Sequence, residues 1–177
     1  IDLKLATFGP DADPLALQDK ERPASYREQV DFFAAAATQA DIVMVGDSIL
    51  GRVQWRDWLP GVEISNRAIP GDYAAWLPDR LDSVIAARAD RAILLVGIND
   101  AVAGRSAETI HRDILTTVAG LDDAGIAVTV LSPLPCTASA DYCLDANRTI
   151  AALDAMLATN PGPNARFVDL RPVLAPG

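Results

Sequence analysis

The alternation of apolar runs and amphipathic stretches along the chain predicts an alternation of strands and helices. Short apolar runs, which are typical of buried parallel strands, occur at residues 42–45, 92–96 and 127–131. A weaker strand is predicted at residues 62–65 and a last one at residues 166–170. Before and between these runs, apolar residues recur at helical spacing over residues 24–39, 73–85, 110–121 and 150–157. Residues 1–23 show neither pattern, and we expect them to form an irregular segment.

Turn and capping residues mark the ends of these elements. Gly46 and Gly97 end two of the apolar runs, Ser106 is a predicted N-cap, and residues 160–163 (NPGP) end the last helix. There is no repeat, linker or low-complexity stretch, so we expect residues 1–177 to form a single domain. Parallel strands joined by right-handed helical crossovers predict an α/β fold, a three-layer α/β/α sandwich with a parallel five-stranded sheet.

Composition and charge narrow the class of protein. Half of the 177 residues are apolar and 22% are charged, which is typical of a soluble globular domain. No apolar run approaches the roughly 20 residues that cross a bilayer, so we expect no membrane span. The net charge of −9, without a basic stripe, argues against nucleic acid as a partner. The oligomeric state is left open.

The two cysteines, Cys136 and Cys143, lie in one predicted loop. There is no CxxC spacing, and the single histidine of the chain cannot complete a zinc site with them. The cysteines could be unpaired, but their position favours a disulfide that staples the loop. A disulfide indicates an oxidising compartment, so we expect a periplasmic or secreted protein. Because the chain begins with Ile1 and not Met, we expect the natural N-terminus to precede it.

Residues suited to acyl transfer follow the first three predicted strands. They lie in residues 46–49 (GDSI), 66–72 (NRAIPGD) and 97–100 (GIND). Each segment alone is ordinary, because serine often caps a helix, glycine supplies a turn and Asn-Asp is common in loops. However, the carboxyl ends of parallel strands meet at one sheet edge, where ligands bind. This edge would combine a hydroxyl nucleophile with backbone and side-chain N–H groups for an oxyanion.

In order and spacing, these segments resemble the SGNH/GDSL hydrolase family, and in particular its small bacterial branch of platelet-activating-factor acetylhydrolase-like esterases. The similarity extends from about residue 41 to residue 170. It implies a flavodoxin-like fold and a serine hydrolase of a small-molecule ester, with no metal or organic cofactor. It also implies Ser48 as the nucleophile, with the N–H groups of Ser48 and Gly71 and the amide of Asn99 as the oxyanion hole.

The residues beside this set have expected supporting roles. Asp47 and Ile98 are expected to contribute to ligand binding. The three flanking aspartates, Asp47, Asp72 and Asp100, are expected to cap loops and hold the turns. The tryptophans are expected to pack in the core and not to form a substrate wall: Trp55, Trp58 and Trp76. A nucleotide-binding function is disfavoured because neither GxGxxG nor GxxxxGK[ST] occurs.

The chain departs from the family in its catalytic base. The family carries its remaining catalytic residues in a late Asp-x-x-His block before a closing helix, and no Asp-x-x-His occurs here. Asp169 is followed by Arg171 and is expected to be structural. His111, the only histidine, falls within a predicted helix that runs away from Ser48, and we expect it to be a half-buried structural residue.

We therefore expect the chain to stop before its catalytic histidine and to be nearly inactive as it stands. A partner chain that supplies the base is one alternative. Another is a non-catalytic binding module, a pseudoenzyme, for acylated or carbohydrate ligands. The sequence does not distinguish among ester substrates, and the branch that it resembles favours a short-chain or acetyl ester.

Overall fold

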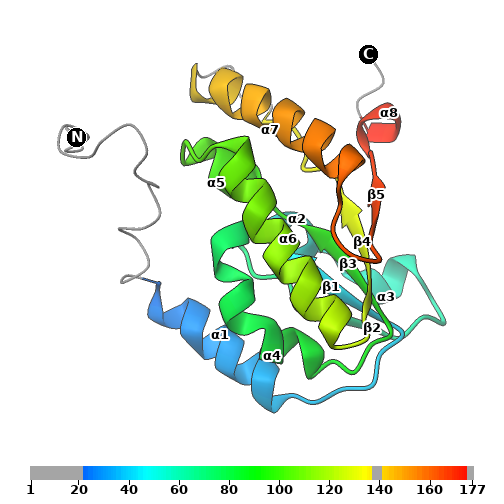
Figure 1. Ribbon diagram of the computed structural model, residues 1–177. Coiled ribbons are helices and arrows are strands. Elements are labelled where there is room, and N and C mark those ends of the chain that lie inside the picture. The colour runs from blue at the N-terminus through cyan, green and yellow to red at the C-terminus, as the bar shows by residue number, and fades with distance from the viewer. Residues whose placement is uncertain (1–21, 137–140, 175–177) are drawn as a thin grey trace.

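In the computed structural model, which describes residues 22–136 and 141–174, the five predicted strands form one parallel sheet (Figure 1). The strands are β1 (Ile42–Gly46), β2 (Ile64–Asn66), β3 (Arg91–Leu95), β4 (Ala127–Leu131) and β5 (Arg166–Val168). Their spatial order is β2-β1-β3-β4-β5. The predicted fold class is therefore confirmed, although β2 and β5 are shorter than expected.

The strand order creates a switch point between β1 and β3. The chain passes from β1 to β2 on one side and then returns to β3 on the other side of β1. Ligands bind at such points in open α/β sheets, outside the carboxyl ends of the strands. Gly46 at the end of β1 lies level with Leu95 at the end of β3. The loops that follow these two strands therefore begin side by side.

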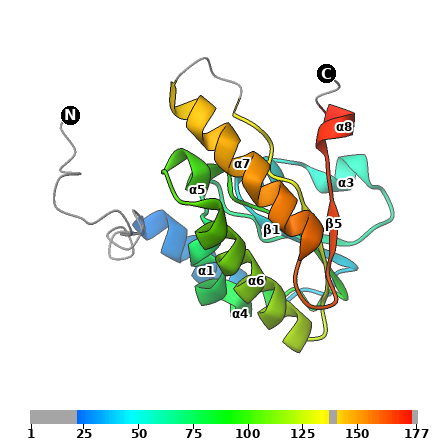
Figure 2. The ribbon, with the colours of Figure 1, turned by 45° about the horizontal axis from the view of Figure 1, so that its top comes forward.

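Three crossover helices cover one face of the sheet, and two of them, α6 and α7, lie side by side in both views (Figures 1 and 2). The helices are α4 (Leu81–Ile85), α6 (Ala107–Asp123) and α7 (Asp141–Thr159), with a short helix α5 (Ile98–Val102) directly after β3. Ser106 caps α6 as predicted, since its Oγ accepts the Thr109 N–H at 3.3 Å. Among the described residues, no helix is long and apolar enough to cross a bilayer.

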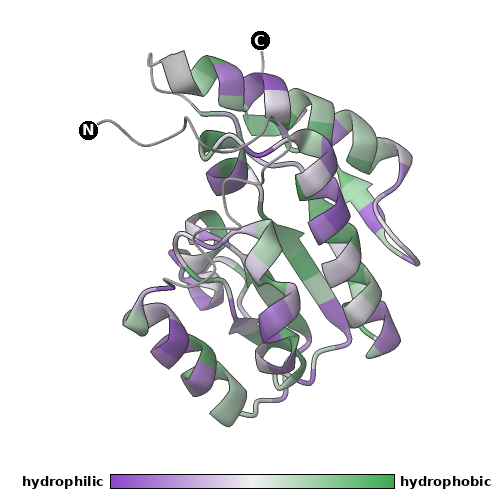
Figure 3. Ribbon diagram, turned by 60° about the vertical axis from the view of Figure 1, so that its left-hand side comes forward, coloured by the Kyte–Doolittle hydropathy of each residue, from purple (hydrophilic) through white to green (hydrophobic). Residues whose placement is uncertain are grey.

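The main core lies between these helices and the sheet. In β1, β3 and β4, every second residue points into this core. In β3 and β4, burial therefore alternates along the first residues of the strand. Figure 3 shows hydrophobic residues along the strands and alternating hydrophobic and hydrophilic residues along the helices. The largest fully buried apolar side chains of this core are Leu77, Leu94, Ile110, Ile114, Leu121, Leu153 and Leu157.

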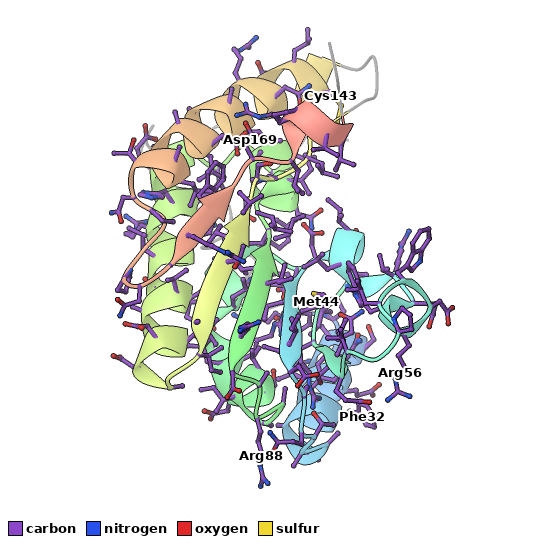
Figure 4. The ribbon with its side chains drawn as sticks, turned by 90° about the vertical axis from the view of Figure 1, so that its right-hand side faces the viewer. Phe32, Met44, Arg56, Arg88, Cys143 and Asp169 are labelled. Carbon is purple, nitrogen blue, oxygen red and sulfur yellow. A yellow bond between two sulfur atoms is a disulfide. The ribbon has the colours of Figure 1, made fainter. Side chains whose placement is uncertain are left out.

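The opposite face of the sheet is covered only in part. The short helices α2 (Ser48–Gly51) and α3 (Trp55–Trp58) cover it beside β1 and β2, where Met44, Leu50 and Leu95 are buried. In the described part of the chain, no helix lies in front of β3, β4 and β5 on this face (Figure 4). Val168 on β5 is 38% exposed. Most residues of the one-turn helix α8 (Arg171–Leu174) are also exposed. Parallel sheets are usually covered on both faces, whereas the described helices cover this face only over β1 and β2.

The N-terminal helix α1 (Ala24–Ala35) ends before residue 39, where the helical pattern ends. Its predicted apolar face is confirmed, because Tyr26 and Phe33 are buried against Ile69 and Trp76. In Figure 1, α1 lies beside α4, with which it is in contact. The helix therefore packs close to the turn that follows β2.

The prediction of one continuous helix over residues 73–85 is wrong. The segment consists of two 3-10 turns, η2 (Ala74–Trp76) and η3 (Pro78–Arg80), followed by α4. Pro78 has no N–H and cannot donate the bond that a continuous helix requires. The apolar pattern is nevertheless satisfied, because Trp76 and Leu77 are buried.

The expected core packing holds for two of the three tryptophans. Trp76 is buried, and Trp55 is half-buried with its Nε1 donating to the Leu50 carbonyl at 3.2 Å. Trp58 is 76% exposed, so the prediction for this residue is wrong. The physical reason is that α3 is a single turn beside the edge strand β2. Trp55 packs against the sheet, and the turn is too short to bring Trp58 to the same face.

The predicted disulfide is present between Cys136, in the loop after β4, and Cys143, in the first turn of α7 (Figure 4). The Asn147 amide adds two hydrogen bonds, accepting from the Cys136 N–H at 2.8 Å and donating to its carbonyl at 3.0 Å. These contacts fix the loop against α7.

We predict that replacing both cysteines by serine lowers the free energy of unfolding by about 2 kcal/mol. The cross-link joins residues seven positions apart and restricts the unfolded chain, by an amount that grows slowly with loop length. Urea unfolding of the double variant checks this value, with reduced wild-type protein as the control that should match it. A difference below about 0.5 kcal/mol would show that the disulfide does not stabilise the fold.

Candidate active site

Ser48 lies at the carboxyl end of β1, as the first residue of α2, and is half-buried. The approach of β1 to β3 at this point requires glycine. Gly46 has φ +141°, and a Cβ there would lie 1.8 Å from the Leu95 carbonyl oxygen. The next residue, Asp47, donates its N–H to the same oxygen at 3.3 Å. This close contact places Ser48 at the switch point.

Asp47 has no exposed surface and acts as the N-cap of α2. Its Oδ1 accepts the Ile49 N–H at 2.9 Å. The pKa of this carboxyl is raised to about 6, mainly by burial and to a smaller extent by the charges of Asp72 and Asp100, while the Ile49 hydrogen bond acts in the opposite direction. The expected capping role is confirmed. The expected contact with a ligand disagrees with the burial of the carboxylate.

Gly71 lies in the turn that follows β2. Two residues earlier, the Ile69 N–H donates to the Gly46 carbonyl at 2.8 Å, so the turn is attached to the end of β1. Gly71 is exposed with φ +83°, and no neighbouring atom lies within 4 Å of the position that a Cβ would take. The turn therefore needs a residue that tolerates positive φ, and its peptide borders open space.

Asn99 lies in the first turn of α5 and is half-buried. Its Nδ2 donates to the Asp72 carbonyl at 2.8 Å, which ties it to the turn that carries Gly71. A side-chain amide has two N–H groups, so one remains for a ligand. The structure thus brings Ser48, Gly71 and Asn99 to one edge of the sheet. Ile98, beside Asn99, is half-buried and packs against the main core.

A buried ion pair between Asp72 and Arg80 stabilises the turn that carries Gly71. The Asp72 carboxylate accepts from Arg80 Nε at 2.8 Å and from Nη2 at 2.6 Å, and both side chains are buried. It also accepts the Tyr26 hydroxyl of α1 at 3.1 Å. Burial raises the pKa of Asp72, while Arg80 acts in the opposite direction. These contacts confirm the expected turn-holding role of Asp72.

Asp100 holds the other end of the same turn. Its carboxylate accepts the Ala74 N–H at 3.0 and 3.2 Å and pairs with Arg105 Nη1 at 2.6 Å. Burial raises the pKa of Asp100 to about 6 even though both contacts lower it. Tyr26, Arg80 and Arg105 were not identified from sequence. A charged residue within an apolar helical face, as at Arg80, is the signal that points to such a pair.

The possible bases in the described chain have other partners. His111 is buried in α6, and its Nε2 donates to the Asn160 carbonyl at 2.8 Å, which confirms a structural role. Asp169 accepts from Arg171 at 2.8 and 2.9 Å, which lowers its pKa to about 2 (Figure 4). Arg171 also lies 3.1 Å from the buried Asp154. Within residues 22–136 and 141–174, no side chain is hydrogen-bonded to Ser48 Oγ.

A cavity of about 330 Å³ opens beside Gly71, between α1 and the turn that follows β2. We call it the Gly71 groove. Its lining comes from Pro23, Ser25, Tyr26 and Gln29 on one side and from Ile69, Pro70, Gly71 and Trp76 on the other. In the part of the chain that the structure describes, no group of three or more His, Cys, Asp or Glu side chains is arranged to hold a metal ion.

Solved structures of similar fold come from several bacteria. A Streptococcus pneumonia protein named for platelet activating factor is 18% identical, with a TM-score of 0.71 over 90% of this chain and 82% of that one. A GDSL-like lipase from Bacteroides thetaiotaomicron is 20% identical, with a TM-score of 0.64 over 82% and 78%. The esterase EstA from Pseudoalteromonas, in a structure inhibited by monoethylphosphonate, is 12% identical, with a TM-score of 0.53 over 75% and 79%.

These similarities show the fold, and the family comes from a separate comparison. A search among curated proteins returns no significant match. The model of the GDSL-like Lipase/Acylhydrolase family matches residues 44–177, which include the Ser48, Gly71 and Asn99 segments. The chain therefore belongs to the GDSL-like lipase/acylhydrolase family.

Proposed function

We propose that the chain is a serine esterase that cleaves short-chain or acetyl esters through an acyl-Ser48 intermediate. The observation that carries the proposal is the linked edge of β1, β2 and β3. Ile69 joins the Gly71 turn to Gly46, and Asn99 joins the same turn through the Asp72 carbonyl. Family membership supports the reaction class, and the phosphonate-inhibited esterase EstA provides a precedent for a probe.

In the proposed mechanism, a base removes the proton of Ser48 Oγ while the oxygen attacks the ester carbonyl carbon. The N–H groups of Ser48 and Gly71 and the remaining N–H of Asn99 stabilise the oxyanion. The carbon–oxygen bond to the alcohol then breaks, and the base returns its proton to the alcohol. Water, deprotonated by the same base, then attacks the acyl-Ser48 carbonyl carbon. The bond to Ser48 Oγ breaks, the base returns the proton to Oγ, and the acid and the free serine are released.

We propose that the base comes from protein outside these 177 residues. The only histidine, His111, is buried and bound to the Asn160 carbonyl. Asp169 is paired with Arg171. The chain by itself should therefore retain only the contribution of the oxyanion hole and be nearly inactive.

A non-catalytic binding module for acylated or carbohydrate ligands is the second candidate function. The absence of a hydrogen-bonded partner for Ser48 Oγ among the described residues favours it. In that case the same N–H groups would bind a carbonyl oxygen without reaction.

We also propose that the protein works in the periplasm or outside the cell. The disulfide between Cys136 and Cys143 supports this location, because such bonds persist in oxidising compartments.

We predict that a fluorophosphonate labels Ser48 slowly in the 177-residue chain and not at all in Ser48→Ala. A longer form of the protein that includes an Asp-x-x-His block should react on the order of 10³-fold faster, because the base activates the hydroxyl. Intact-protein mass spectrometry measures the rate. If the longer form also fails to react, the binding module is supported. If the 177-residue chain turns over esters at the full rate, the proposal of an external base is wrong.

We predict that Asn99→Ala slows phosphonylation of Ser48 by about 10²-fold, because one donor to the developing oxyanion is lost. The rate of labelling measures the effect. Asn164→Ala is the matched control, since Asn164 donates to Asp122 at the opposite edge of the sheet. Equal labelling rates in the two variants would show that Asn99 is not part of the oxyanion hole.

We assign no proton transfer to Asp47, and its burial has a consequence for stability. Its pKa is about 6 in the folded protein, against an ordinary value near 3.8. Between these values, the folded protein holds a proton that the unfolded chain has released. The free energy of unfolding therefore decreases as the pH rises through this window, and the decrease is complete above about pH 6.

We predict that Asp47→Asn reduces the fall in unfolding free energy between pH 4 and pH 7 by on the order of 2 kcal/mol, since the neutral amide does not titrate. Urea unfolding at several pH values measures the fall. Asp57→Asn, at an exposed position of α3, is the control and should behave as wild type. An unchanged pH profile in Asp47→Asn would contradict the raised pKa.

A further inference from the structure

The Gly71 groove begins at a proposed oxyanion donor. One wall is formed by Ser25, Tyr26 and Gln29 from the first two turns of α1, and the other includes Ile69 and Trp76. Gly71 itself lines the groove, with open space where a side chain would project. Gly71 therefore belongs both to the proposed oxyanion hole and to the lining of the groove, so that the groove starts at the site where the ester carbonyl would bind.

The walls of the groove are fixed by contacts outside it. The Tyr26 hydroxyl is bonded to the buried Asp72, and the Tyr26 and Trp76 rings meet edge to face at 5.2 Å. The guanidinium of Arg22 lies 5.3 Å from the centre of the Trp76 ring and pairs with Asp79 at 2.6 Å. Widening or closing the groove would break these contacts. The site is therefore preformed, which lowers the cost of binding.

The lining of the groove selects against charge. It contains no charged side chain, and its buried part consists of Ile69 and two aromatic rings. Polar groups occur toward its exposed end, at Ser25 and Gln29. Such a lining suits an uncharged, mainly apolar group.

The same lining indicates which half of an ester it takes. The leaving alcohol must receive a proton from the base, so it has to lie where the base is. The only ionisable side chain in the lining is Tyr26, which is committed to Asp72. A leaving alcohol in the groove would find no proton donor. The acyl chain needs none.

The volume of the groove indicates how long an acyl chain it can hold. A volume of about 330 Å³ corresponds to on the order of ten groups of the size of a water molecule, at ~30 Å³ each. We propose that the Gly71 groove binds the uncharged acyl chain of the ester substrate, up to roughly eight carbons. This inference rests on the proposed esterase function and places the preferred ester within the short-chain class but above acetyl.

The test measures binding without requiring turnover. Octanamide and acetamide serve as unreactive analogues of the two acyl groups, and ligand-observed NMR on the 177-residue chain gives their affinities. We expect octanamide to bind at least 10-fold more tightly, because its longer chain is buried. Gln29→Trp should fill the groove and weaken octanamide binding at least 10-fold while leaving acetamide binding unchanged.

Glu28→Trp is the matched control, since Glu28 is the exposed neighbour of Gln29 on α1 and does not line the groove. It should bind octanamide as wild type does. Ser25→Trp is a second filling variant, one helical turn from Gln29, in case Gln29→Trp does not fold. Thermal unfolding of each variant verifies the fold.

The outcomes separate this inference from the proposed function. If the two amides bind equally, or if neither filling variant affects octanamide binding, the groove does not bind the acyl chain. This conclusion would hold even if Ser48 reacts with a fluorophosphonate. Selective octanamide binding, together with no labelling of Ser48 in a longer form that includes an Asp-x-x-His block, would support the groove and reject the esterase. Concentration-dependent dimerisation that Gln29→Trp abolishes would show a second copy of the chain in the groove, and would overturn the proposal.

Discussion

The buried carboxylate of Asp72 is the contact on which the candidate site depends. Two charge-assisted bonds from Arg80 and one from the Tyr26 hydroxyl meet on it, in a region without exposed surface. A buried charge without a partner would destabilise the fold strongly, so the turn can hardly move away from Arg80. That turn carries Gly71 on one side, and its Asp72 carbonyl receives the amide of Asn99. One ion pair therefore fixes two of the proposed oxyanion donors.

The same contact joins the site to the rest of the fold. Tyr26 reaches Asp72 from α1, so the N-terminal helix becomes a wall of the groove beside Gly71. On the other side, Asp100 holds the Ala74 N–H and pairs with Arg105. Asp47 remains without an arginine and keeps a raised pKa. The site is thus rigid around its donors, whereas Ser48 has no bonded base in the described residues. The contacts that hold the proposed oxyanion donors are therefore independent of any base for Ser48.

Much of the fold followed from local pattern. Apolar runs of four or five residues between amphipathic helices have few arrangements other than a parallel sheet with crossovers, and the five strands were placed within a few residues. The failures were also local in origin. Pro78 interrupts the helical pattern of residues 73–85, and Trp58 lies on a turn too short to bury it. Apolar periodicity does not reveal the length of an element at the sheet edge.

By itself, the sequence determined the fold class, a parallel five-stranded sheet with crossover helices, and it predicted the disulfide that the structure contains. It also proposed Ser48, Gly71 and Asn99 as site residues, because each follows a predicted strand and matches the family pattern. Only the tertiary structure decided how these residues are held. Tyr26 and Asp72 are 46 positions apart, and no spacing rule connects them. Nor could the groove be inferred, since the lining residues of its two walls are at least 40 positions apart in the sequence. Contacts between distant segments arise from packing, which a linear pattern does not encode.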